Sequence, residues 1–228
     1  QDKAVFSSST YQDGANFSGS TYQGEVFFRG SVYRGWVVFN GSAYREEADF
    51  CGSTYQRGAD FSDSTYRGRA GFGNSIYQEG ANLSRSTYWG EADFSGSIFC
   101  SEIYFGQDGD NSSFSRFTGC APQFYDETNR KNTLFGSPDN DFSVENGRGY
   151  PVYRNLESLP LGCAFLTAEQ KEYLADKFQE IEKINNKLLD IKDDEEKAKL
   201  LNTLGSLKKE LDVWCERVTT VKVESTTS

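Results

Sequence analysis

Large apolar residues recur along the first 105 residues at steps that alternate between five and six, without an error over 19 units. A smaller residue stands two positions before each large one; it is Ala, Val or Ile at one kind of unit and Ser at the other. Residues two apart point to the same side of an extended chain, so each unit carries one inward pair. The large positions are Phe6, Tyr11, Phe17, Tyr22, Phe28, Tyr33, Phe39, Tyr44, Phe50, Tyr55, Phe61, Tyr66, Phe72, Tyr77, Leu83, Tyr88, Phe94, Phe99 and Phe105.

This spacing predicts a stack of short extended sides. One side cannot bury its aromatic ring alone, so consecutive sides must close around a shared interior and successive coils must stack at roughly 4.8 Å. Two five-residue and two six-residue sides give about 22 residues per coil, with Phe above Phe on two opposite walls and Tyr above Tyr on the others. An 11-residue coil with two sides is the alternative, which the usual packing distance of about 10 Å between sheets disfavours.

Three segments carry a resemblance to a known family: Ala15–Gly19, Ala48–Gly52 and Ala92–Gly96. They resemble the pentapeptide-repeat family, whose motif is Ala-Asp/Asn-Leu/Phe-Ser/Thr-X, and the likeness covers about 100 of the 228 residues. It implies a mainly β fold, a right-handed quadrilateral β-helix with four sides per coil. This chain departs from the motif because every second centre is Tyr. A buried phenol needs a hydrogen-bond partner, and we expect the Ser at the position two residues before each Tyr to supply it, either within the unit or from a neighbouring coil.

The outward residues differ between two opposite walls. One wall carries Thr10, Val32, Thr54, Ile76 and Ile98, and the other carries Thr21, Ala43, Thr65 and Thr87. Strand propensity accounts for β-branched residues at such positions. A flat recognition face is the sharper interpretation, with Thr21, Thr65 and Thr87 as its candidate residues; ice binding is disfavoured because Ala43 interrupts the row.

Residues 106–165 lack clean periodicity and contain all four prolines, so we expect an irregular connector that caps the solenoid of residues 1–105. Frequent aromatic residues indicate that this connector is ordered. Asp108–Asn111 and Asp139–Asp141, with Glu145, resemble oxygen-ligand loops for calcium. Neither fits EF-hand spacing, and turn chemistry explains such clusters without metal. We therefore predict no metal site.

Residues 166–218 predict an antiparallel helical hairpin, followed by a polar tail over 219–228. Thr167 and Gln170 have the spacing of a capping box, and Asn185 with Asn186 interrupts the apolar stripe of the first helix. Two helices bury one seam poorly, so we expect their remaining apolar faces to dock on the connector, on the end of the solenoid or on another chain. Leu204, Leu211 and Trp214 are the candidate docking residues.

Charge and composition exclude several classes of function. The net charge of −10 disfavours nucleic acid or an anionic membrane as partner, and the absence of His removes His-based triads and zinc sites. The sequence lacks phosphate-binding glycine loops, and carboxylates on a convex rod lack the cleft that catalysis requires. We predict no enzyme, no catalytic residue, no cofactor and no small-molecule substrate. The five cysteines lack CxxC spacing, and a Cys120–Cys163 bridge is conceivable only in an exported protein.

These observations favour a non-enzymatic scaffold that binds a protein partner or self-associates through residues 166–218. A second hypothesis is a mimic of DNA that regulates a type II topoisomerase, as in some pentapeptide-repeat proteins. Residues 1–105 contain 12 acidic and 8 basic residues, too balanced for a dense negative surface. A third is an exported or surface-associated structural subunit, suggested by the start at Gln1, which indicates processing or a fragment.

Overall fold

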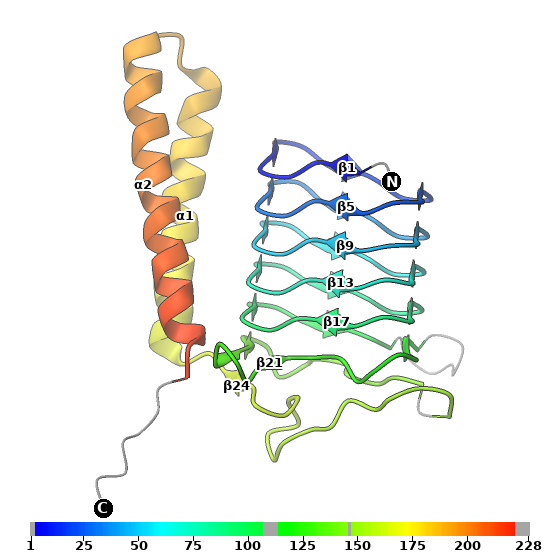
Figure 1. Cartoon of the computed structure of the whole chain (residues 1–228). Helices are drawn as coiled ribbons and strands as arrows, with labels where there is room; N and C mark the ends of the chain where they lie inside the picture. Colours follow the sequence, from blue (N-terminus) through cyan, green and yellow to red (C-terminus); the bar gives the residue numbers. More distant parts are fainter. Residues whose placement is uncertain (1–2, 107–113, 146, 222–228) are drawn as a thin grey trace, which may run out of the picture.

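The chain forms a four-sided β-solenoid with a helical hairpin standing along one side (Figure 1). This description comes from a computed structural model and covers residues 3–106, 114–145 and 147–221, without the side chain of Asp190. The predicted fold class, a β-solenoid followed by a helical hairpin, is confirmed.

Each side of the solenoid is a parallel sheet of two-residue strands, and we name the four sheets walls A to D in chain order. Wall A contains β1 (Ala4–Val5), β5 (Val26–Phe27), β9 (Ala48–Asp49), β13 (Ala70–Gly71) and β17 (Ala92–Asp93). Wall B contains β2 (Thr10–Tyr11), β6 (Val32–Tyr33), β10 (Thr54–Tyr55), β14 (Ile76–Tyr77), β18 (Ile98–Phe99), β23 (Leu134–Phe135) and β24 (Ala164–Phe165). Wall C contains β3 (Ala15–Asn16), β7 (Val37–Val38), β11 (Ala59–Asp60), β15 (Ala81–Asn82) and β19 (Ile103–Tyr104). Wall D contains β4 (Thr21–Tyr22), β8 (Ala43–Tyr44), β12 (Thr65–Tyr66), β16 (Thr87–Tyr88) and β20 (Arg116–Phe117).

The strand register confirms a coil of 22 residues. Ala4 pairs with Val26 on wall A, and Thr10 pairs with Val32 on wall B. The rings therefore stack on their own kind: Phe28 and Phe50 have centroids 5.3 Å apart, and Tyr33 and Tyr55 have centroids 5.1 Å apart. Rings on different walls meet edge to face, as Phe28 and Phe39 do between the opposite walls A and C and Tyr33 and Phe39 do between the neighbouring walls B and C, an arrangement that aromatic quadrupoles favour. The aromatic interior predicted from the spacing is present.

The expected pairing of each core Ser with the Tyr two residues later is not what these serines do. The Ser53 hydroxyl accepts the Ser31 backbone N–H at 3.2 Å and donates to the Phe28 carbonyl at 3.3 Å. The Ser53 hydroxyl acts to lower the pKa of Tyr55, but burial raises that pKa by more. The serines thus tie one coil to the next through the backbone. Among the described residues, five buried tyrosine hydroxyls have no hydrogen-bond partner: Tyr33, Tyr44, Tyr55, Tyr66 and Tyr88.

One corner of each half-coil requires the left-handed backbone region. A residue with positive φ recurs every eleven positions from Ser8 to Gly96, and five of these nine residues are glycine. Glycine adopts that conformation without steric cost, which explains the repeated Ser-Gly after a Phe unit. The remaining four are Ser8, Asp63, Asn74 and Arg85.

The solenoid continues beyond residue 105 through the region predicted to be a connector. Phe117, Phe124, Phe135 and Phe142 stack on the last regular rings of walls D, A, B and C, with centroid distances of 4.6, 5.0, 5.5 and 6.3 Å. Strands β20 and β23 pair with β16 and β18 in the same parallel manner. Residues 114–142 therefore belong to a further coil that also covers the end of the regular stack. The antiparallel pair β21 (Tyr125–Asp126) and β22 (Lys131–Asn132) is inserted in this coil.

The hairpin consists of α1 (Ala168–Asp190) and α2 (Asp194–Thr219). The Thr167 side chain and Gln170 form the predicted capping box. The hairpin packs against the outer face of wall B, where Ile76, Ile98 and Leu134 join its apolar cluster. Of the docking surfaces expected from the sequence, the connector contributes Leu134 and Ala164; the flank of the regular solenoid, which was not expected, contributes Ile76 and Ile98.

Candidate interaction surface

Wall D lies opposite the hairpin and presents a flat row of small outward side chains. Thr65 pairs in register with Ala43 on one side and with Thr87 on the other. Thr21 is exposed, and Thr65 and Thr87 are half-buried between their neighbours. Because inward residues alternate with outward ones, burying the Tyr column fixes these threonines on the outer surface. The structure thus places Thr21, Thr65 and Thr87 together on one accessible wall.

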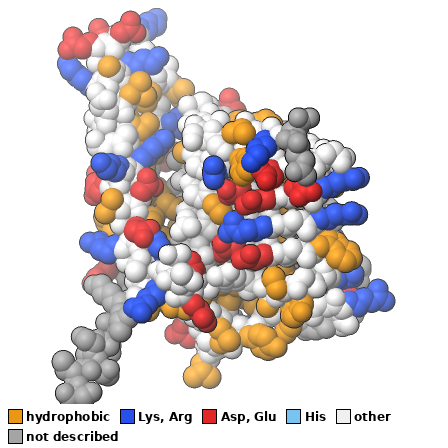
Figure 2. All heavy atoms as spheres, viewed as in Figure 1, with side chains coloured by type: hydrophobic (Ala, Val, Ile, Leu, Met, Phe, Trp, Pro, Cys, Tyr) orange, Lys and Arg blue, Asp and Glu red, His pale blue; other side chains and the backbone are white. Residues whose placement is uncertain are grey.

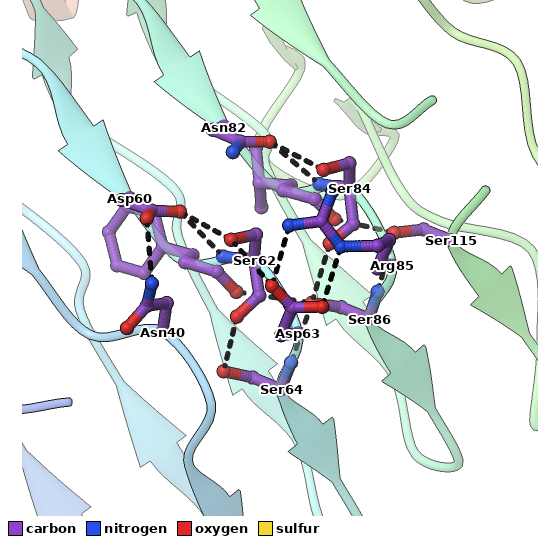
Figure 3. A network of polar contacts seen from close by, with 12 residues as sticks. Asn40, Asp60, Ser62, Asp63, Ser64, Asn82, Ser84, Arg85, Ser86 and Ser115 are labelled. Carbon is purple, nitrogen blue, oxygen red and sulfur yellow. Dashed lines mark hydrogen bonds and ion pairs between the residues drawn. The ribbon is translucent and has the colours of Figure 1, made fainter. Parts of the chain in front are cut away.

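A repeated polar network fixes the corner between walls C and D (Figure 3). Asp60 accepts hydrogen bonds from the Ser62 backbone N–H at 3.0 Å and from the Ser62 hydroxyl at 2.6 Å. Asn82 makes the same pair of bonds with Ser84 one coil later. The repeated Asx residue therefore holds the turn that leads into wall D, and the strand that follows starts from a defined position.

The acidic residues at this corner are paired as well. The Arg85 guanidinium holds Asp63 in a two-pronged ion pair with distances of 2.6 and 2.7 Å, and it keeps the pKa of Asp63 below its usual value. The carboxyl of Asp60 accepts a hydrogen bond from Asn40 at 3.0 Å. These contacts are those of turn and surface residues.

Wall A carries interleaved charges of both signs. The Arg69 guanidinium lies 2.7 Å from Asp93, 3.3 Å from Glu47 and 3.9 Å from Glu91. Figure 2 shows blue and red side chains alternating over the solenoid face that carries these strands. One guanidinium of this wall thus lies within ion-pair distance of three carboxylates.

The candidate residues of the hairpin occupy the contact with the solenoid. Leu204, Leu211 and Trp214 are 4–7% exposed and lie in one cluster with Ile76 and Ile98 of wall B. The indole of Trp214 also stacks on Tyr173, with centroids 4.7 Å apart. Their apolar area is thus used within the chain. Apolar residues that remain exposed on the helices include Leu189, Leu201 and Val213.

The cysteines and the acidic loops contribute no metal site in the described part of the chain. No group of three potential ligands from His, Cys, Asp and Glu occurs among those residues, and all five cysteines are free thiols. Cys120 and Cys163 accordingly form no bridge. Burial raises the pKa of Cys100, Cys163 and Cys215 to about 12, so these thiols stay protonated at neutral pH. The Asp108–Asn111 loop lies outside the described residues, and the Asp141 carboxyl accepts the Ser143 N–H at 2.8 Å as a turn residue.

Sequence reasoning missed the residues of wall B that receive the hairpin. Strand propensity alone accounts for Ile76 and Ile98 in the sequence, whereas in the structure they are 6% and 0% exposed and cluster with apolar residues of the helices. A signal was available, because the outward residues of wall B become more apolar toward the C-terminal coils while those of wall D remain Thr or Ala. An outward row that is too apolar for solvent indicates a covering element.

No helix in the described ranges is both long and apolar enough to cross a membrane. Comparisons of the chain with protein-family models, with curated proteins and with solved structures found no match.

Proposed function

We propose that the chain is a non-enzymatic scaffold that binds a protein partner through wall D. The observation that carries this proposal is the contrast between opposite walls: wall B is covered by the hairpin, whereas wall D keeps an outward row of Thr21, Ala43, Thr65 and Thr87 in register, which ends at the ion-paired Arg116. Such a surface places side chains at a regular spacing of roughly 4.8 Å on a rigid support. We further propose that the solenoid is a Phe/Tyr-rich variant of the pentapeptide-repeat architecture, on the strength of its four walls and its alternating units.

Two observations support a non-catalytic role. The carboxylates described above are engaged by serine, asparagine or arginine side chains, and the most buried thiols have raised pKa values. A cleft that combines a nucleophile with a base would be the feature to expect of an enzyme. DNA mimicry is not favoured, because Arg29 and Arg69 lie among the acids of wall A and interrupt a continuous negative surface.

The test is crosslinking from defined positions in the source cell. A photo-reactive phenylalanine analogue is placed at position 65 on wall D, or at position 38 on wall C as the control, because Val38 is an outward, half-buried residue whose side chain holds no turn. The proposal expects one discrete adduct from position 65, absent from position 38 and lost when Thr87→Arg is added. The adduct identifies either another protein or a second copy of the chain. Equal adducts from both positions, or none from position 65, would contradict a recognition role for wall D.

A further inference from the structure

The tip of the hairpin forms a pocket with the first two coils of the solenoid. The hairpin extends past β1 at the N-terminal end of the solenoid (Figure 1). A cavity of about 360 Å³ lies between this tip and wall B, within the size range of small-ligand sites. Wall B contributes Arg34, α1 contributes Leu188 and Leu189, and α2 contributes Lys197, Leu201 and Lys208.

The charge of this pocket is opposite to that of the whole chain. The chain has a net charge of −10, yet Arg34, Lys197 and Lys208 line the pocket and no described acidic residue does. None of the three forms an ion pair with a described residue, whereas Arg29, Arg57, Arg69, Arg85 and Arg116 each have a carboxylate partner. The pocket is therefore a concentration of unpaired positive charge.

Arg34 is held in place but left electrostatically unsatisfied. Its guanidinium donates to the Gln12 side chain and to the Asn185 side chain of α1, both of which are neutral. Its buried Nε–H has no acceptor among the described residues. Burial lowers the pKa of Arg34. Burial and the charge of Arg34 also lower the pKa of Lys208. Asp212, four residues along α2, acts to raise the pKa of Lys208. Two like charges held in a partly desolvated site repel each other, and a bound anion would relieve that repulsion.

The rest of the lining is apolar. Of the lining leucines, Leu189 is 72% exposed, Leu201 is 50% exposed and Leu188 is half-buried. Leucines at this density beside cations suit a ligand with an anionic head and a hydrocarbon body, because each part then leaves water for a complementary surface. An inorganic anion would leave the leucines uncovered, and a neutral hydrocarbon would leave the cations unpaired.

The geometry points to a binding site for a small amphipathic anion, a carboxylate or phosphate on a short hydrocarbon chain, with Arg34 and Lys208 at its head and Leu188, Leu189 and Leu201 along its body. The site is formed only when the hairpin lies on wall B, since its lining comes from both. Binding should therefore also stabilise the docked hairpin.

Calorimetric titration of the full chain tests this site with four probes at low and high salt. Sodium octanoate and octyl phosphate distinguish a carboxylate head from a phosphate head, 1-octanol lacks the charge and inorganic phosphate lacks the chain. We expect one or both amphipathic anions to bind at least about tenfold more tightly than 1-octanol or phosphate, and more weakly at high salt. Binding of 1-octanol or of phosphate as tight as that of the amphipathic anions, or no binding of either anion, would overturn the assignment.

Substitutions locate the site. Arg34→Gln and Lys208→Met should each weaken binding roughly tenfold. Their controls are Arg45→Gln, the same repeat position on wall D, and Lys209→Gln, the next residue of α2, which should bind as the unaltered chain does. Lys208→Met keeps the test valid if Arg34→Gln disturbs hairpin docking, because it replaces a partly buried cation by an apolar chain of similar length. Equal affinity in Lys208→Met and in the controls would refute the site.

Discussion

Replacing Tyr55 by Phe should make the protein more stable, although it removes a polar group from a fully ordered core. The Tyr55 ring is 0% exposed and stacks between Tyr33 and Tyr77 at centroid distances of 5.1 and 4.6 Å. Its hydroxyl has no hydrogen-bond partner among the described residues. The substitution leaves both ring contacts unchanged and removes only the oxygen.

Two effects set the magnitude. Burying a hydroxyl without a partner costs about 1–3 kcal/mol in proteins, and the substitution recovers that cost. The void left by one oxygen costs about a few tenths of a kcal/mol, since residual cavity is penalised by roughly 24 cal/mol per Å³. The free energy of unfolding should therefore rise by about 1 kcal/mol or more. The same columns already accept Phe at positions 99 and 117, where the rings stack at 4.4 and 4.6 Å.

Urea unfolding followed by circular dichroism measures this change, with the slope of the transition compared between variants. Tyr77→Phe is the matched control, because the Tyr77 hydroxyl donates to the Phe72 carbonyl at 3.5 Å and its loss should bring a smaller gain. A Tyr55→Phe protein that is less stable than the unaltered chain by more than about 1 kcal/mol would refute the reasoning. That result would mean that the hydroxyl is satisfied, for instance by an internal water.

Three further predictions concern pH, glycine and the hairpin. Burial raises the pKa of the core tyrosines in the folded protein. Their contribution to stability should therefore be fully present below pH 10, where the phenols are protonated in the folded and the unfolded chain. Above pH 10 the free energy of unfolding should fall by about 1.4 kcal/mol per pH unit for each buried phenol, which thermal melts between pH 8 and 11 measure. Gly90→Ala should destabilise by at least about 2 kcal/mol, since its new Cβ would lie 2.3 Å from the Gly68 carbonyl oxygen, whereas Gly205→Ala in α2 meets nothing within 4 Å and should stabilise by about 1 kcal/mol. Urea midpoints that change equally in the two variants would contradict this. Trp214→Ala should lower the free energy of unfolding by about 3–5 kcal/mol, because Trp214 belongs to the cluster that joins the hairpin to wall B. The linker before Thr167 should then be cleaved faster by protease. An unchanged cleavage rate would show that the hairpin is held without this residue.

The regular coils and both helices were predictable because each follows a local rule. An aromatic every five or six residues has no other way to be buried, and Thr167 with Gln170 is a capping box in sequence and in structure. The further coil was not predictable by spacing. Its core residues Phe117, Phe124 and Phe135 are separated by 7 and 11 positions, because insertions such as the β21–β22 hairpin interrupt the repeat without breaking the stack.

The candidate sites were harder to predict because they depend on contacts between distant segments. The outward threonines of wall D follow from alternation alone, and they lie where the pattern places them. The burial of Leu204, Leu211 and Trp214 does not follow from the helix pattern, which fixes the apolar face without its counterpart. The cationic pocket depends on Arg34 facing α1, a contact across 151 residues of sequence that no local rule encodes.

The position of the hairpin changes the order in which the protein can mature. A stack of coils forms by contacts between neighbours in sequence, so each coil can fold soon after it leaves the ribosome. Wall B, however, receives its cover from the last part of the chain: α2 ends at Thr219, 121 residues after Ile98, which corresponds to roughly 6–24 s of synthesis at 5–20 residues per second. Throughout that interval Ile76 and Ile98 face solvent on an otherwise finished surface. The nascent chain therefore has a defined period of vulnerability to aggregation, and translation of the helices ends it.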